Sequence, residues 1–397
     1  MNNFIIPNAL QIVVDDLGWM NGKDDRENGG PSRTGMPRKH CAEDYAAINE
    51  LGKTIGMKIN CAFVIGEWDP DNRLGKIPYF SKYGENWDNA KYLDRAELAR
   101  MVEVINASEY IDISIHGLMH GSQKPGIDNN DSSDFFYMKN GAKYTFAEKE
   151  LREKLDAFFG LLNFYGVKKE VNSYTPSAAL YVPDTLSRIL PEYGVKYIIQ
   201  PFCATQNFAE SNPFLVTMDN GIIVTDRCNF IKKEGFTRTM DIRPWDEVAS
   251  DFPALPKATC MVGTHWPNYL HLDPKRSLEL TAHTAEYFKS CADVFGSMMS
   301  RDLGFYSTQA LYKRFAKTEE KDGVFTVDVS TVSKPIGTLG KFYISAKNPV
   351  KNHSGCEISL YETKETHLTY EIVPASDVMM FFKNRTKSKA EMPCFLL

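Results

Sequence analysis

The sequence predicts an α/β protein in which a (β/α) barrel is followed by a small all-β module. Up to about residue 300, short apolar runs alternate with amphipathic segments of helical period, which is typical of parallel strands joined by helices. From Val324 onward, short β-type runs separated by turn residues follow one another, and no helical period remains. The chain of 397 residues is also too long for one small core, so two domains are expected.

Seven apolar runs of the first domain are candidate strands. They are LQIVVD (10–15), MKINCAFVIG (57–66), YIDISIHG (110–117), EVNSYT (170–175), VKYIIQ (195–200), NGIIVTD (220–226) and TCMVGTH (259–265). Seven strands with helices between them indicate a (β/α) barrel with fewer than eight units.

Helical segments lie between these runs, and the clearest spans 147–166. Five large side chains recur there at spacings of four, three, four and three: Leu151, Leu155, Phe158, Leu162 and Tyr165. Gly166 stands where a helix C-cap is expected. A second helix is expected from Ser277 to about Phe295, and a shorter one over 183–194.

The second domain is predicted from five β-type runs. They are VFTVDVS (324–330), KFYISAK (341–347), EISLYET (357–363), LTYEIVP (368–374) and VMMFFK (378–383). The sequence pattern changes near 316–323 from alternating apolar and helical segments to short β-type runs. This change predicts a barrel domain over 1–316 and a small β-sandwich or β-sheet module over 317–397.

Composition and charge exclude several classes of function. The net charge is −5 and the pI is near 6.0, so the basic face of a nucleic-acid-binding protein is not expected. No apolar run is long enough to span a membrane, and no signal peptide is recognised, so a cytoplasmic protein is expected unless a signal has been removed. The eight cysteines form no C-x-x-C pair, which argues against a cysteine zinc site.

Polar residues follow three of the predicted strands at the point where each ends. Asp15 and Asp16 follow LQIVV, His116 and His120 lie at the end of the third run, and His265 ends the last run. In a parallel barrel the residues just past the strand C-termini gather on one face, where active sites form. We therefore expect these five side chains to meet.

These residue types indicate a metal-dependent reaction. One Asp oxygen and two His nitrogens make a three-ligand set that leaves positions open for water, as a catalytic zinc site requires. The H-x-x-x-H spacing suits a helix turn or a tight loop after a strand, and Gly117 favours the loop. Two adjacent carboxylates can divide the work, because one binds metal while the other accepts a proton.

Four segments carry a resemblance to a known family. VVDDLG (13–18), SIHGLMHG (114–121), the stretch from Ser173 to Ile198 and VGTHW (262–266) resemble the ordered motifs of the polysaccharide deacetylase (NodB-homology) family. The resemblance covers roughly residues 10–295. It implies an irregular (β/α)₇ barrel with Asp15 as general base, His265 as general acid, and three metal ligands: Asp16, His116 and His120.

The resemblance also implies an activity and its partners. The protein is expected to remove an N- or O-linked acetyl group from a carbohydrate, with Zn²⁺ as the default metal and Co²⁺, Ni²⁺ or Mn²⁺ as alternatives. A backbone N–H near Pro176 is expected to help hold the oxyanion. Trp19 and Trp266 adjoin site residues and are expected either to stack on sugar or to pack in the core.

The sequence departs from the family pattern in two places. The third motif normally carries an Arg shortly before its proline, but here Tyr174 and Thr175 precede Pro176. Arg227 and Arg243 are candidates to replace that Arg. In the H-x-x-x-H motif, Gly117 stands where Ser or Thr is commoner.

Two other interpretations compete with the deacetylase. DDLGW and GGPSRTG (29–35) imitate sulfatase motifs, but Gly29 stands where a sulfatase needs Cys or Ser, so this interpretation is disfavoured. The missing Arg motivates a catalytically inactive barrel that binds glycans, with the β-module as a binding unit. The sugar, the acyl position and the oligomeric state are left open.

Overall fold

The computed structural model describes residues 3–201, 216–229, 261–294 and 298–383, apart from short gaps at 26, 28–29, 82, 129–132, 178–180, 333 and 337–338. By its internal contacts the chain divides into two units. The larger comprises residues 9–307 with 335–337, and the smaller comprises residues 1–8, 308–334 and 338–397. The predicted domain division between 316 and 317 stays a prediction.

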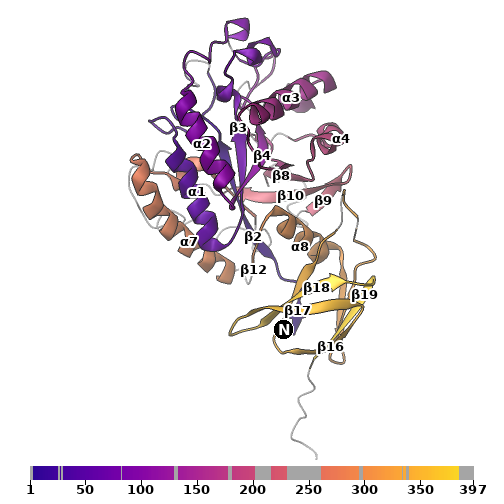
Figure 1. Cartoon of the computed structure of the whole chain (residues 1–397). Coiled ribbons are helices and arrows are strands. Elements are labelled where there is room, and N and C mark those ends of the chain that lie inside the picture. Colours follow the sequence, from indigo (N-terminus) through magenta and orange to yellow (C-terminus); the bar gives the residue numbers. More distant parts are fainter. Residues whose placement is uncertain are drawn as a thin grey trace, which may run out of the picture. The chain divides into compact units, whose positions relative to one another are not determined.

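A curled parallel sheet forms the centre of the larger unit (Figure 1). Its main strands are β2 (Ala9–Leu17), β3 (Ile59–Val64), β4 (Ile111–Gly117), β7 (Val171–Tyr174), β8 (Tyr197–Pro201), β10 (Ile222–Asn229) and β11 (Met261–His265). They pair in the order β2-β3-β4-β7-β8-β10-β11, and β11 pairs in parallel with β2 again. All seven predicted strands are therefore confirmed, and their C-terminal ends face the same way.

Two short strands and a hairpin complete the strands described in this unit. β12 (Met298–Met299) pairs in parallel with the start of β2, and β9 (Val216–Asp219) pairs antiparallel with β10. β5 (Phe136–Lys139) and β6 (Ala142–Thr145) form a separate antiparallel hairpin. The strands are buried because helices cover the sheet: every residue of β2 is buried.

Helices lie between the strands, as the alternating pattern predicts. α1 (Ala42–Ile55) contacts both α2 (Arg95–Ala107) and α7 (Ser277–Val294), and the three lie along one side of the sheet in Figure 1. α3 (Glu148–Phe164) confirms the clearest predicted helix, and α7 confirms the second. α8 (Leu303–Phe315) follows, and the division between the two units falls within it, after Ser307.

The helix predicted over 183–194 is shorter than expected. Only α4 (Leu186–Ile189) is α-helical, and a 3₁₀ turn, η6 (Leu190–Tyr193), completes the segment. Pro191 lies in this turn and cannot donate a backbone hydrogen bond, which explains the change of helix type. Other 3₁₀ turns are η2 (Gly66–Trp68), η3 (Arg73–Lys76), η4 (Gly84–Asn86), η9 (Trp266–Tyr269) and η10 (Pro274–Arg276).

The smaller unit contains two antiparallel sheets. One has the order β1 (Phe4–Ile5), β15 (Phe342–Ala346), β18 (Leu368–Pro374) and β17 (Cys356–Thr363). The other has the order β13 (Lys317–Lys321), β14 (Val324–Asp328), β19 (Val378–Lys383) and β16 (Val350–Ser354). The rings of Phe4 and Phe325 stack at 5.1 Å between centroids and so join the two sheets. The five predicted strands of this region are confirmed.

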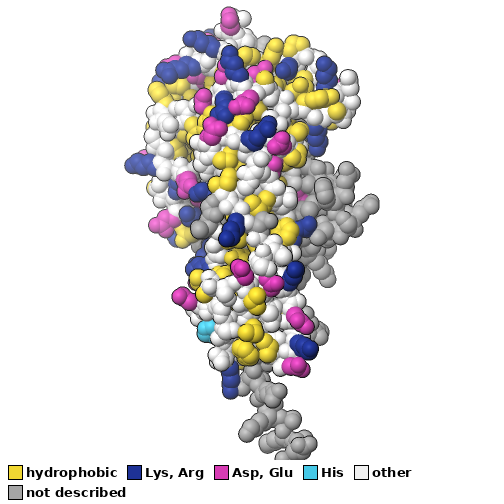
Figure 2. Space-filling view, turned by 90° about the vertical axis from the view of Figure 1, so that its right-hand side faces the viewer, with side chains coloured by type: hydrophobic (Ala, Val, Ile, Leu, Met, Phe, Trp, Pro, Cys, Tyr) yellow, Lys and Arg dark blue, Asp and Glu magenta, His cyan; other side chains and the backbone are white. Residues whose placement is uncertain are grey.

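The surface carries charges of both signs. In the face shown by Figure 2, Lys and Arg side chains are interspersed with Asp and Glu. None of the described helices combines the length and apolar character needed to cross a membrane.

Candidate metal centre

Three predicted ligands lie together at the C-terminal edge of the sheet. Asp16 is near the end of β2, His116 is near the end of β4, and His120 is in the loop after β4; β3 lies between these two strands. The Nε2 atoms of His116 and His120 each lie 3.7 Å from Asp16 Oδ1. One possible ligand atom from each residue lies within 4.8 Å of the others. The three residues predicted as metal ligands thus form one cluster, with geometry that could hold a metal ion.

Two of the three residues of the cluster have a left-handed backbone conformation. Asp16 has φ 68° and His120 has φ 54°. The pairing of β2 with β3 also shifts register between Val14 and Leu17, so that a bulge re-aims the residues between them. Because such conformations cost free energy in residues other than Gly, they persist where the surroundings fix them, often at functional sites. His120 lies in a loop after β4, which confirms the loop alternative for the H-x-x-x-H motif.

His116 is held in the tautomer that a metal ligand needs. Its Nδ1 lies 2.6 Å from the carbonyl oxygen of Thr175, which can only accept, so Nδ1 carries the proton and Nε2 presents its lone pair to the cluster. Ser177 Oγ donates to the carbonyl of His116 at 2.8 Å. Burial is the chief cause that lowers the pKa of His116, which favours the neutral ring. The segment around Pro176 therefore supports the first histidine.

The donor set fits a divalent metal. Asp16 Oδ1 is buried and has no hydrogen-bond partner within the described part of the chain, although it lies between two imidazole nitrogens. An unsatisfied buried carboxylate oxygen is costly unless a cation or donor occupies the space beside it. One carboxylate and two imidazoles also leave coordination positions open, as catalytic sites require.

Asp15, the neighbour of Asp16 in the chain, pairs with Arg227 of β10. Arg227 Nη1 lies 2.8 Å from Asp15 Oδ1, and Nη2 lies 2.5 Å from Oδ2, with both side chains buried. Burial alone would raise the pKa of Asp15, but the charge of Arg227, assisted by His116 and His265, lowers this pKa to about 2. Of the two candidates to replace the missing third-motif Arg, Arg227 is the one in contact, and Arg243 lies outside the described residues.

Gly263 of β11 makes this pairing possible. β11 lies between β10 and β2, and a Cβ on Gly263 would come within 2.8 Å of Arg227 Cδ and Nη1. The guanidinium therefore crosses β11 at the position without a side chain. A glycine inside a predicted strand is the sequence signal for such a close approach.

His265 is the last residue of β11 and is paired in register with Asp15 of β2. Its Nε2 lies 4.0 Å from Asp16 Oδ2, and its side chain is 31% exposed. Its backbone N–H donates to Asn268 Oδ1 at 3.2 Å, which ties the strand end to η9. His265 thus borders the cluster and also reaches solvent, while His116 is fully enclosed.

The two tryptophans next to the site are fully buried, each with 0% exposure. Trp266 stacks on His40 at 4.0 Å between centroids, and the Arg33 guanidinium lies 5.5 Å from the Trp19 ring centre. This burial favours the packing alternative over sugar stacking. Pro176 is buried as well, and its part in holding an oxyanion stays a prediction.

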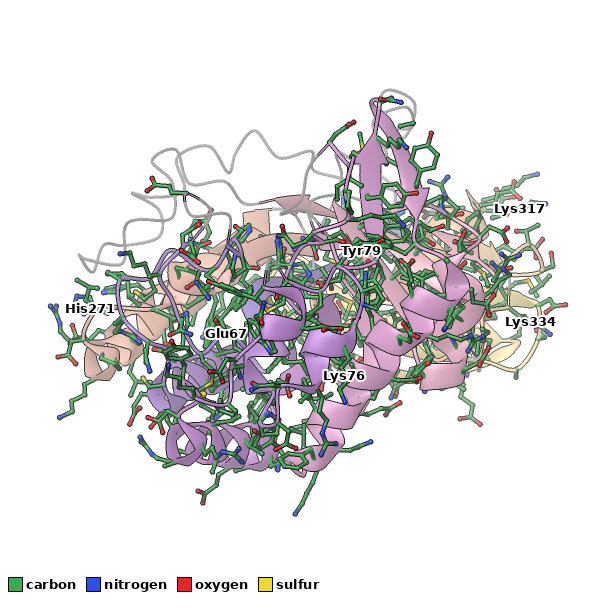
Figure 3. All side chains as sticks on the ribbon, turned by 90° about the horizontal axis from the view of Figure 1, so that it is seen from above. Glu67, Lys76, Tyr79, His271, Lys317 and Lys334 are labelled. Atoms are coloured by element: carbon green, nitrogen blue, oxygen red, sulfur yellow. The ribbon has the colours of Figure 1, made fainter. Side chains whose placement is uncertain are left out.

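Glu67 supports the site and was not predicted from the sequence. Its Oε2 accepts the backbone N–H groups of Met20 and Asn21, each at 2.9 Å, and its Oε1 accepts Arg33 Nε at 2.9 Å. The carboxylate thereby anchors the segment that follows Asp16. In Figure 3, which looks from above, Glu67 lies well inside the outline of the molecule, while His271 lies at its edge. The Nδ1 of His271 accepts the backbone N–H of Asp273, a role within its own loop.

Comparison with known proteins gives no assignment at the level of sequence, because neither a protein-family model nor a curated protein matches. Among solved structures, similar chains include a CE4 family pseudoenzyme from Bacillus anthracis (11% identity, TM-score 0.34, covering 75% of this chain and 64% of that one). Its mutant with restored enzymatic activity is 12% identical with a TM-score of 0.34, covering 75% of this chain and 66% of that one.

A GH57-type branching enzyme from the hyperthermophilic archaeon Pyrococcus horikoshii is also similar. It has 11% identity and a TM-score of 0.41, covering 74% of this chain and 69% of that one. At this level of similarity none of these structures assigns a fold type or a function to the chain.

Proposed function

We propose that this protein is a metal-dependent hydrolase of the NodB type, with an irregular (β/α)₇ barrel, that removes acetyl groups from a carbohydrate. The observation that carries the proposal is the cluster of Asp16, His116 and His120, bordered by the ion-paired Asp15 and the partly exposed His265. The cluster supplies ligands for a metal, and its two neighbours supply the groups for two proton transfers.

Asp16, His116 and His120 would hold the metal, with Zn²⁺ as the default and Co²⁺, Ni²⁺ or Mn²⁺ as alternatives. When bound, such an ion polarises an acyl oxygen and makes water more acidic. The protein's own part is to fix the donor atoms. The Thr175 carbonyl sets the tautomer of His116, and the left-handed backbone of His120 directs the second imidazole toward Asp16.

Asp15 is the general base. Its carboxylate stays ionised through the contact with Arg227, and it keeps further lone pairs that can accept a proton from the attacking water. The bidentate contact also fixes the plane of the carboxylate, so that its free lone pairs keep one direction.

His265 is the general acid. Its partial exposure allows it to reach a bound substrate, and its ring donates a proton to the leaving nitrogen or oxygen as the acyl bond breaks. The oxygen of the attacking water ends in acetate, and the amine or hydroxyl leaves with the proton from His265. Asp15 then releases the proton it took from water, and His265 takes up a proton, so both groups return to their starting states.

A carbohydrate substrate is supported by the motif resemblance, since the four segments that carry it include every residue assigned above except Arg227. The parallel order of the strands supports the barrel type, because β11 pairs with β2 and brings His265 beside Asp15.

The deciding experiment combines metal analysis with an acetate-release screen on N- and O-acetylated glycans. We expect about one metal ion per chain and release of acetate that a chelator stops. His116→Ala is expected to lack both metal and activity, whereas Asp15→Asn is expected to keep the metal and lose activity. Wild-type protein that holds metal and binds glycans without releasing acetate would instead support the inactive glycan-binding barrel.

A further inference from the structure

The loop that carries His120 is wrapped around the carboxylate of Asp134. Asp134 Oδ2 accepts the backbone N–H of Leu118 at 3.0 Å and that of His120 at 3.0 Å. The backbone N–H of Met119 lies 3.2 Å from Oδ1 and 3.3 Å from Oδ2. Three successive amides thus point at one buried anion, an arrangement known as a nest.

Gly117, just before this loop, is matched to the same carboxylate. Its φ is 151°, a conformation that L side chains rarely adopt, and a Cβ added there would lie 2.1 Å from Asp134 Oδ2. The carboxylate therefore occupies the space that a side chain at position 117 would need. This accounts for the glycine in the H-x-x-x-H motif where Ser or Thr is commoner.

A buried cation lies beside Asp134. Lys154 of α3 is 2% exposed, its Nζ donates to the main-chain carbonyl of Asp134, and it lies 3.7 Å from the centre of the Phe146 ring. A buried carboxylate is tolerated when its charge is balanced and its lone pairs are satisfied. Lys154 and the three amides provide both, and they join the loop to helix α3.

We propose that Asp134 is a positioning residue for the metal ligands, holding the 117–120 loop in the conformation that brings His120 to His116 and Asp16. The proposal rests on the metal site of the proposed function. No contact is needed between Asp134 and the metal, because the residue acts through the backbone. Because the loop is already ordered before the metal binds, binding does not have to supply the free energy of ordering it. Residues that hydrogen-bond to metal ligands commonly orient those ligands in this way.

The nest also explains how His120 keeps its left-handed backbone. Without the carboxylate, the amides of Leu118, Met119 and His120 lose their shared acceptor, and the loop relaxes toward φ values that suit L residues. Relaxation moves the His120 Nε2 away from Asp16 Oδ1, to which it is now 3.7 Å. The expected consequence is weaker metal binding with altered ligand geometry.

The test compares Asp134→Asn and Asp134→Ala with a control at an exposed aspartate, Asp128→Asn. The carboxylate of Asp128 also accepts a backbone N–H, that of Gly141 at 2.9 Å. Gly141 belongs to the turn between β5 and β6, so this contact does not involve the loop that carries His120. Affinities for Zn²⁺ are measured by competition with a chelator, and the visible spectrum of the Co²⁺ form reports ligand geometry. Thermal unfolding of the metal-free proteins reports folding.

We expect Asp134→Asn to bind Zn²⁺ about 10–100-fold more weakly than wild type, with a changed Co²⁺ spectrum, and Asp134→Ala to be weaker still. Asp128→Asn should match wild type in Zn²⁺ affinity and in the Co²⁺ spectrum. Hydrogen exchange at residues 118–120 of the metal-free protein should be faster in both Asp134 variants and unchanged in Asp128→Asn. If Asp134 variants unfold, Gly117→Ala displaces the carboxylate without removing its charge and should produce the same loss of affinity.

Wild-type affinity and an unchanged Co²⁺ spectrum in a folded Asp134→Asn protein would overturn this proposal and leave the hydrolase intact. Absence of acetate release by a wild type that binds Zn²⁺ would overturn the proposed function, while weaker binding by Asp134→Asn would still support the positioning role. If the wild type binds no metal, both proposals are wrong.

Discussion

Arg227 and Asp15 meet across an intervening strand, with two nitrogen–oxygen contacts of 2.8 and 2.5 Å. Arg227 belongs to β10 and Asp15 to β2, and β11 lies between them with Gly263 at the crossing point. Planar bidentate pairing of this kind fixes direction as well as charge. The pair therefore determines both the ionisation and the orientation of the proposed general base.

Removing Arg227 should raise the pKa of Asp15. Without the guanidinium, burial is the main remaining influence on this carboxyl, and burial raises its pKa. The pKa of Asp15, now about 2, should rise by about 1–3 units in Arg227→Ala. Activity on the acidic side should then be lost at a higher pH than in wild type, and the pH profile of kcat/KM measures this.

Two further variants control that experiment. Arg227→Lys keeps the charge but loses the bidentate geometry. The acidic limb of its kcat/KM profile should therefore shift to higher pH by less than in Arg227→Ala, while kcat/KM itself still falls. Gly263→Ala places a methyl group against Arg227 and should have an effect of the same kind. An acidic limb that stays in place in Arg227→Ala, with metal still bound, would contradict the assignment of Asp15 as base.

Much of the site could be predicted because it depends on local pattern. Apolar runs locate the strands, and polar residues at their C-terminal ends locate the face where Asp16, His116 and His120 meet. The choice between Arg227 and Arg243 could not be made in that way. It depends on strand order, since only the return of β11 to β2 brings residue 227 within reach of residue 15.

Asp134 and Glu67 were missed for a related reason. Each acts by accepting backbone N–H groups from a loop distant in sequence, and backbone donors leave no pattern in the amino-acid letters. Among strands, β13 and β16 were missed because KTEEK and VKNHS lack apolar alternation. β1 was missed because its partner, β15, lies more than 300 residues further along the chain.

Single replacements of the clustered histidines should remove the metal without unfolding the protein. His116→Ala and His120→Ala each delete one of three ligands, so stoichiometric metal should be lost while unfolding stays cooperative. Metal that binds only the folded state stabilises it by about 2.7 kcal/mol at a hundred times its Kd. Adding Zn²⁺ should therefore raise the unfolding temperature of wild type but not of either variant.

His283→Ala is the control for those variants, because His283 is an exposed histidine of α7 outside the cluster. It should retain both the metal content and the thermal response of wild type. Full metal content in both His116→Ala and His120→Ala would end the assignment of these residues as ligands.

Lys154 should make stability rise with pH in the alkaline range. Burial lowers the pKa of Lys154 from 10.5 to about 8 in the folded protein. Between these values the unfolded chain binds the proton and the folded protein does not, so this group adds stability as pH rises from about 8 to 10.5. The gain in the free energy of unfolding should be at most a few kcal/mol.

The measurement is denaturant unfolding of wild type and Lys154→Met at pH 8 and pH 10. Other groups titrate in this range in both proteins, so the difference between the two slopes isolates Lys154. Equal slopes in the two proteins would show that Lys154 is not protonated differently in the folded and unfolded states.

Asp15 and His265 separate a hydrolase from a glycan-binding barrel. If they transfer protons, each is needed for turnover but not for binding, so Asp15→Asn and His265→Ala should lower kcat by about 10²–10⁴ with metal content unchanged. His265→Ala should be most severe for amide substrates, because an amine must be protonated to leave, and milder for acetyl esters. Glycan affinity, measured by calorimetry, should change little in either variant. If metal-loaded wild type releases no acetate from ester or amide, and all three proteins bind glycans equally well, the protein is a binder and the two residues have no catalytic role.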